Sequence, residues 1–233
     1  MVDVPQDPEW HPEGPVWDHT MLVLDEAARL KSGDDDADLV LLLGALCHDL
    51  GKPETTFEEG GRIRSPEHDE KGVPIAESFL YRLRASNELK EKVGALVRHH
   101  LAPSQLIKGG AKARGYRRLS RRLGEAGVDP DMLYRVAKAD HFGRTTPDAL
   151  ARTFDYGDAF LERMKELSIA EEVQKDVVLG RHLIARGVKP GVWIGTVLSA
   201  CREVQDDTGW DDPDRILDRV LKDGVPGGGD QSS

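Results

Sequence analysis

Apolar residues recur along most of this chain at the three- and four-residue spacing of one helix face. That spacing is typical of amphipathic helices. The clearest example is the segment 87–100, where Leu89, Val93 and Leu96 fall on one face. Gly, Pro and Asp residues separate such segments, as expected of turns. The pattern predicts helices over residues 19–31, 38–50, 75–83, 87–100, 119–123, 130–140 and 147–167, and a long helix that ends near 204.

Local signals mark some of the boundaries. Asp18 is the expected N-cap of the first helix. Gly51 and Pro53 are expected to end the strongly apolar helix 38–50. Residues 55–65 are polar and rich in glycine, which indicates a loop or a small hairpin, and no sustained alternating pattern calls for a larger sheet. We therefore expect an all-α fold, a helical bundle with a small helical C-terminal extension.

Composition agrees with packed helices. The chain has 233 residues, is 39% hydrophobic, and has only 6% aromatic residues. Its apolar residues are mostly Leu, Val and Ala, which favour helices over sheets. The length suits one large domain with an appendage. We expect the main domain over residues 10–167, the extension over 168–224, and a disordered tail over 225–233.

Charge and cysteine content narrow the functional classes. The formal net charge of −10 argues against a uniformly basic nucleic-acid binder. The two cysteines form no C-x-x-C pair, so a disulfide framework is not expected and a reducing cytoplasm is the expected location. No apolar run approaches the ~20 residues of a membrane span. Residues 108–122 are basic and contain no acid; Arg117 and Arg118 there can receive an RNA backbone, or the stretch can be a solvated face that balances acidic neighbours.

Histidines and aspartates stand at the ends of several predicted helices. His48 and Asp49 end the apolar helix, where a buried ionised carboxylate needs a partner such as a divalent cation. Imidazole mixed with carboxylate suits Mn²⁺, Fe²⁺, Co²⁺, Ni²⁺ or Zn²⁺. Taken singly, each of these histidines and aspartates has an ordinary structural explanation. For His11, His141 and His182 we expect that explanation to hold. The other candidate site residues at predicted element ends are, in chain order, His19, His68, His99, His100 and Asp140.

The order His19, His48-Asp49, Asp140 resembles the HD-domain phosphohydrolase superfamily of helical metal-binding proteins. A narrower resemblance, covering roughly residues 10 to 205, is to the HD and C-terminal region of bacterial tRNA CCA-adding enzymes. Its motifs are residues 11–20 (HPEGPVWDHT), 45–52 (ALCHDLGK), His68-Asp69, 97–100 (VRHH), 139–144 (ADHFGR) and 187–195 (GVKPGVWIG). That family usually has Arg-Tyr-His where this chain has Arg98-His-His100, so the ligand role goes to His100. His99 is then a supporting or substrate-binding group.

The resemblance implies one or two divalent transition metals. We expect His19, His48, Asp49 and Asp140 to bind the first, and Asp49 to bridge to a second held by His68 and His100. Asp49 and Lys52 are the expected catalytic residues. Lys52 and Arg144 are expected to place positive charge against a phosphate. On spacing alone, a solvated charge at a helix end explains Lys52 equally well.

The resemblance also directs the expected activity. CCA-adding enzymes carry a nucleotidyltransferase head before the HD region, whereas this sequence begins at the HD region, so nucleotide addition to tRNA is not expected. The HD regions of that family are associated with 2′,3′-cyclic phosphodiesterase and 2′-phosphatase activity. We therefore expect a metal-dependent hydrolase of nucleotide or RNA 3′-end phosphoesters. The alternatives are an HD hydrolase of free nucleotides (5′-nucleotidase or (p)ppGpp hydrolase) and a non-catalytic tRNA- or RNA-binding module. The sequence does not indicate the oligomeric state.

Overall fold

The computed structural model describes residues 1–169, 175–188 and 190–222. It confirms the predicted all-α class, with one two-stranded hairpin as the exception among these residues. The elements of the first part are α1 (Val16–Arg29), α2 (Asp35–Cys47), α3 (Lys52–Thr55), β1 (Phe57–Glu59), β2 (Arg62–Arg64), α4 (His68–Arg82), α5 (Asn87–His99), α6 (Ala102–Lys108) and α7 (Ala113–Glu125). They are followed by α8 (Pro130–Phe142), α9 (Pro147–Leu150), α10 (Asp155–Glu166), α11 (Gly180–Ala185), α12 (Ile194–Thr208) and α13 (Pro213–Leu221).

The chain divides into two compact units. The first comprises residues 1–110 and 120–173, and the second comprises residues 111–119 and 174–233. The division falls inside α7. The extension over residues 168–224 stays a prediction; in this division the second unit also includes the segment 111–119. The expected disordered tail, 225–233, lies outside the described residues.

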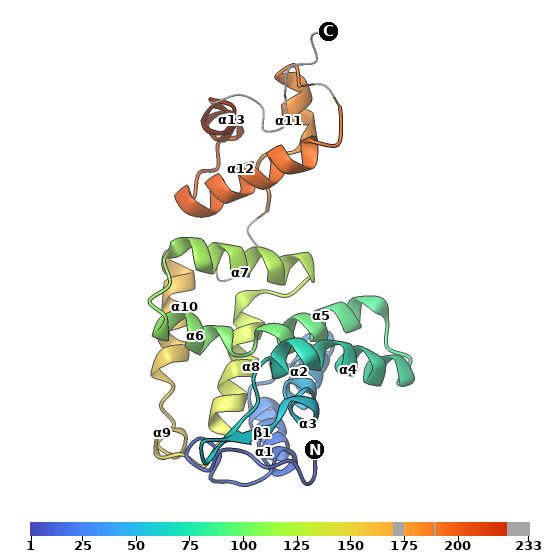
Figure 1. Cartoon of the computed structure of the whole chain (residues 1–233), viewed down its shortest axis with the longest axis vertical. Helices are drawn as coiled ribbons and strands as arrows, with labels where there is room; N and C mark the ends of the chain where they lie inside the picture. The colour runs from blue at the N-terminus through green and yellow to red at the C-terminus, as the bar shows by residue number, and fades with distance from the viewer. Residues whose placement is uncertain (170–174, 189, 223–233) are drawn as a thin grey trace. The chain divides into compact units, whose positions relative to one another are not determined.

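The first unit is a bundle built around α2. This helix packs against α1, α5 and α8, and α1 also packs against α8. Figure 1 shows α4 lying alongside α5, and α6 and α10 lie beside α8. Because α2 has neighbours on several sides, its residues are apolar almost all round, and Leu41, Ala45 and Cys47 are fully buried. This packing brings the C-terminal ends of α2 and α5 close to α8.

Several helix boundaries differ from the sequence expectation. Pro15, not Asp18, is the N-cap of α1, and Asp18 lies in its first turn. Helix α4 begins at His68, earlier than expected, and includes Pro74 within its length. The expected helix 147–167 is two helices, α9 and α10, with Phe154 buried between them. The structure also has α6, α13 and a longer α7, none of which the apolar pattern predicted.

The second unit has its own small core. Leu183 of α11, Val197 and Cys201 of α12, and Ile216 and Leu217 of α13 form one buried cluster. Charged contacts surround this core: the first turns of α7 are held to α12 by ion pairs in which Glu203 is the acid. No helix of the described part is long and apolar enough to cross a membrane.

Candidate metal centre

Six of the predicted metal ligands come together in the first unit, from five elements. His19 lies on α1, His48 and Asp49 directly follow α2, His68 begins α4, His100 directly follows α5, and Asp140 lies on α8. Five of the six are at most 5% exposed, and His68 is half-buried. The packing of α1, α5 and α8 on α2 is therefore what gathers them.

Two groups of possible ligands share one carboxylate. The atoms of His19, His48 and Asp49 lie close enough to hold one cation, and those of Asp49, His68 and His100 can hold another. In the first group, Nε2 of His48 is 3.2 Å from Oδ2 of Asp49. In the second, Nε2 of His68 is 3.4 Å from Oδ1 of Asp49. Asp49 thus offers a different oxygen to each group, and Oδ1 of Asp140 lies 3.1 Å from Nε2 of His19.

Backbone carbonyls fix the orientation of three of these imidazoles. Nδ1 of His48 donates to the carbonyl of Ala45, and Nδ1 of His100 donates to that of Val97, each at 2.7 Å. Nδ1 of His68 donates in the same way to the carbonyl of Ser65, also at 2.7 Å. A carbonyl can only accept, so the proton of each neutral ring is on Nδ1 and the Nε2 lone pair is free to bind a metal.

His19 is oriented by a carboxylate. Its Nδ1 lies 2.8 Å from Oε1 of Glu13, although this contact is not aligned as a hydrogen bond. Nδ1 of His11 donates to the same oxygen at 2.9 Å. Burial alone would raise the pKa of Glu13, but these two histidines hold it well below its ordinary value. Glu13 is therefore an anion close to Nδ1 of His19, and the other nitrogen of that ring faces Asp140.

The carboxylates of the centre are ionised and the imidazole of His100 is neutral. Burial acts to raise the pKa of Asp49, but His48 and Lys52 hold it well below its usual range. In the same way Arg144 and His19 outweigh burial and keep the pKa of Asp140 low. Burial lowers the pKa of His100 to about 4. These are the protonation states that metal ligation requires.

The donor set fits a divalent cation. Nε2 of His68 and Nε2 of His100 are only 3.3 Å apart, and because both rings carry their proton on Nδ1, two lone pairs face each other unless a cation lies between them. Nε2 of His48 is buried without a hydrogen-bond partner, and Oδ2 of Asp49, which is ion-paired with Lys52, accepts no aligned hydrogen bond. Buried polar groups of this kind are normally satisfied. Neutral imidazoles and carboxylates are ligands of transition metals.

Two cations border the centre. Lys52 is only 7% exposed, and its Nζ lies 2.7 Å from Oδ2 of Asp49 and donates to Gln6 at 2.6 Å. It is therefore not a solvated charge at a helix end. Arg144 donates to Asp140 at 3.1 Å. Both line a cavity of about 230 Å³ that four of the predicted metal ligands, Asp49, His68, His100 and Asp140, also border.

The structure does not bring every predicted residue to this cavity. His99 is next to His100 in sequence, but it borders a different surface cavity, beside Arg98 and Arg122. Consecutive helical residues point about 100° apart, so the neighbour of a ligand faces elsewhere, and we withdraw the substrate-binding role of His99. Arg117 and Arg118 belong to the second unit, where Arg117 donates to the carbonyl of Asp206 and Arg118 to Glu203. The predicted basic stretch is thus partly neutralised within its own unit.

His11 and Glu13 are site residues that sequence reasoning missed. His11 lines the cavity, and with Glu13 and His19 it forms a third group of possible metal ligands. The His-x-Glu spacing of His11 and Glu13, shortly before the Pro15 that begins α1, is the available signal, whereas on sequence alone an ordinary structural explanation is adequate for His11. For His141 we also expected an ordinary structural role. Its Nε2 donates to the carbonyl of Thr153 at 2.7 Å.

The comparison with known proteins decides the family, because residues 16–142, more than half of the chain, match the HD domain. The chain belongs to the HD domain family. A multifunctional CCA protein of Alkalilimnicola ehrlichii is 37% identical to it over 101 residues, 43% of this chain and 23% of that protein. The CC-adding tRNA nucleotidyltransferase of Thermus thermophilus is 31% identical over 198 residues, 82% of this chain and 41% of that protein. The chain therefore spans less than half the length of either relative.

These findings confirm the predicted resemblance to the HD superfamily and to CCA-adding enzymes. Membership of this family supports the coarser part of the predicted function, a metal-dependent phosphohydrolase that binds divalent metal through its His and Asp residues.

Proposed function

We propose that this HD domain hydrolyses phosphoesters of nucleotides or RNA 3′ ends, with 2′,3′-cyclic phosphodiesters and 2′-phosphates as its preferred substrates. The observation that carries the proposal is the pair of ligand groups joined by Asp49, which borders a cavity that also contains Lys52 and Arg144. Such a site has the charge and the donors that phosphoryl transfer needs.

His19, His48, Asp49 and Asp140 would hold one cation, and Asp49, His68 and His100 would hold a second. A divalent transition ion such as Mn²⁺, Co²⁺, Ni²⁺, Fe²⁺ or Zn²⁺ supplies Lewis acidity towards a phosphoryl oxygen and makes hydroxide available near neutral pH. The protein keeps the imidazoles of His48, His68 and His100 in one tautomer and the carboxylates of Asp49 and Asp140 ionised, so these five ligands are already prepared for binding.

Lys52 and Arg144 act on the substrate rather than on the metal. Both carry positive charge at the cavity wall, and both are largely removed from bulk water. In such surroundings a fixed positive charge stabilises a phosphoryl group strongly, and most strongly when the group gains negative charge in the transition state. Glu13 and Gln6 are positioning residues, because Glu13 orients His19 and Gln6 accepts from Lys52.

The preference for RNA-end phosphates comes from the relatives and from the cavity. One relative is named as a tRNA nucleotidyltransferase and others as CCA proteins. A cavity of about 230 Å³ with a polar wall accommodates a cyclic phosphate and part of its ribose. RNA or tRNA is accordingly the partner we propose.

The test is a substrate panel with chelator-treated protein to which each of the five metals is returned. We expect adenosine 2′,3′-cyclic phosphate and 2′-AMP to be hydrolysed faster than 3′-AMP, 5′-AMP or ppGpp. Asp49→Asn should abolish turnover, whereas Asp36→Asn, an exposed aspartate on the same helix, should not change it. Turnover of only 5′-AMP or ppGpp would assign the free-nucleotide alternative. No turnover with any metal, together with tRNA binding that Asp49→Asn leaves unchanged, would assign an RNA-binding module.

A further inference from the structure

A second cavity adjoins the one at the metal centre. Its volume is about 180 Å³, and His100, Leu101, Asp140 and Arg144 border both cavities. Beyond these shared residues, its wall is formed by Ser104, Gln105, Lys108, Ala137, His141 and Phe154. A substrate whose phosphate lies at the metal ligands can therefore extend in a second direction, between α6, α8 and the residues that precede α10.

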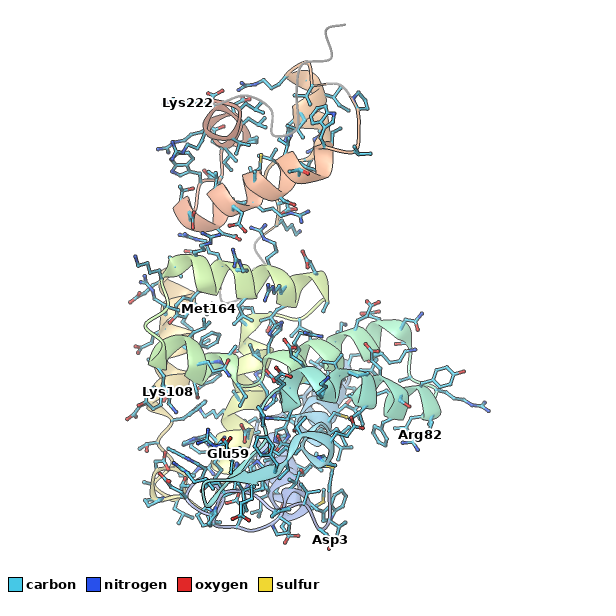
Figure 2. The ribbon with its side chains drawn as sticks, in the orientation of Figure 1. Asp3, Glu59, Arg82, Lys108, Met164 and Lys222 are labelled. Atoms are coloured by element: carbon cyan, nitrogen blue, oxygen red, sulfur yellow. The ribbon has the colours of Figure 1, made fainter. Side chains whose placement is uncertain are left out.

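Lys108 is the cation of this second cavity. It is the last residue of α6, labelled in Figure 2, and it is exposed. No carboxylate of the described residues pairs with it, whereas Lys52 and Arg144 each have an aspartate partner. In a protein of net charge −10, an unpaired ammonium beside the active-site cavity is a group that can bind an additional anion.

Two exposed aromatic rings hold the Lys108 ammonium. Its Nζ lies 4.7 Å from the centre of the Tyr156 ring and 5.8 Å from the centre of the Trp10 ring. Tyr156 is 47% exposed and Trp10 is 49% exposed, and Trp10 also borders the cavity of the metal centre. Cation–π contacts orient the ammonium, and an exposed indole or phenol ring offers a face on which a nucleobase can stack.

We propose that Lys108, Trp10 and Tyr156 bind the penultimate nucleotide of an RNA strand whose last nucleotide carries the scissile phosphate. The phosphate that joins these two nucleotides lies at Lys108, and the penultimate base lies against one of the two rings. This proposal rests on the proposed function and deepens it. It means that the substrate is an RNA end rather than a mononucleotide, because only a strand brings a second phosphate and a second base to the site.

The test compares two substrates in the metal-loaded protein: adenosine 2′,3′-cyclic phosphate and the dinucleotide ApA that ends in a 2′,3′-cyclic phosphate. We expect kcat/KM to be about tenfold higher for the dinucleotide, since stacking of one base alone has about this effect. Lys108→Met should lower the ratio severalfold, mainly by raising KM for the dinucleotide, because the phosphate contact is lost while both rings remain. Trp10→Ala or Tyr156→Ala should lower the ratio as well.

The matched control is a similar pair elsewhere in the same unit. Nζ of Lys90 lies 5.6 Å from the ring centre of Tyr81, which is 71% exposed. Lys90→Met and Tyr81→Ala therefore remove a cation–π pair of the same kind that borders neither cavity of the site. Neither should change the ratio. A ratio near one in the unaltered protein, or an equal loss on both substrates in Lys108→Met, would overturn the proposal.

A binding measurement separates this inference from the proposed function. The dissociation constant of a longer oligoadenylate that ends in a 3′-phosphate is measured in metal-free protein at several salt concentrations. Lys108→Met should weaken binding and reduce the slope of log affinity against log salt by about 0.7, the value for one contact to a single strand. If no substrate is hydrolysed, the proposed function fails, while this slope still decides whether Lys108 binds a phosphate; an unchanged slope would contradict the inference.

Discussion

Replacing Gly51 with alanine should separate His68 from the other metal ligands. Gly51 has φ −79° and ψ −20°, an ordinary helical conformation that alanine adopts without strain. The added Cβ would lie only 2.1 Å from the carbonyl oxygen of His68 and 2.7 Å from the backbone nitrogen of Gly72. Both of these atoms are backbone, so no side chain can turn away. The first turns of α4 must therefore move.

These contacts set how far the carbonyl of His68 must move. Real Cβ atoms essentially never come within 3.0 Å of such an atom, so the carbonyl of His68 must retreat by about 0.9 Å. Overpacking of this kind costs about 1–3 kcal/mol. At about 2–4 °C for each kcal/mol in a chain of this size, Tm should fall by roughly 2–12 °C. The same displacement breaks the approach of His68 to Asp49, because metal–ligand distances tolerate only about ±0.2 Å.

The assay combines thermal unfolding with metal titration. Gly51→Ala should unfold at a lower temperature and should lose affinity for the metal bound by His68 and His100, while the metal at His19 and His48 is less affected. Gly195→Ala is the matched control: nothing lies within 4 Å of its added Cβ, and a glycine within a helix such as α12 gains up to about 1 kcal/mol from alanine. The reasoning is refuted if Gly51→Ala has the Tm and the metal affinity of the unaltered protein.

Three further predictions follow from the same contacts. Saturation with metal at 100 times its dissociation constant should raise the stability of the unaltered protein by about 2.7 kcal/mol; chelation should remove this gain, and Asp49→Ala should show no gain in the same thermal-shift titration. Burial raises the pKa of Cys47 to about 12 and that of Cys201 to about 11, so neither thiol should be alkylated by iodoacetamide at pH 8 in the native state; rapid modification seen by mass spectrometry before unfolding would contradict this. Glu203→Ala removes the acid that binds two arginines of α7, but because these pairs are about half exposed the loss in a urea-unfolding measurement should stay below about 1 kcal/mol.

The sequence sufficed to predict the helical class, because apolar spacing is a local signal, whereas the six predicted ligands came from the resemblance to HD-domain proteins. His48 and His100 directly follow α2 and α5, and the structure brings the ends of these two helices together by packing both against α8. The choice of His100 over His99 came from family resemblance alone. Its physical reason is the rotation of α5 about its axis, which only the contacts of Val93, Leu96 and Val97 with neighbouring helices determine.

The full length of α7 and the place of Glu13 in the site were not predicted, because both depend on residues distant in sequence. Helix α7 is basic and has few apolar positions, so the apolar pattern indicated only five helical residues there. Its arginines are paired with Glu203 and Asp207 of α12, more than eighty residues later. Likewise, Glu13 became recognisable as part of the site only when the structure placed it beside His11 and His19.

The three histidines that donate to carbonyls have a consequence for building metal sites. His48, His68 and His100 each bond to the carbonyl of the residue three positions earlier. For two of them that carbonyl belongs to the last turn of a helix, where carbonyls otherwise lack a partner. The ligand's orientation is thus specified within four consecutive residues and needs no distant support. We expect that such a segment, transferred to the end of another helix, would give a histidine with its proton on Nδ1 and Nε2 available to a metal.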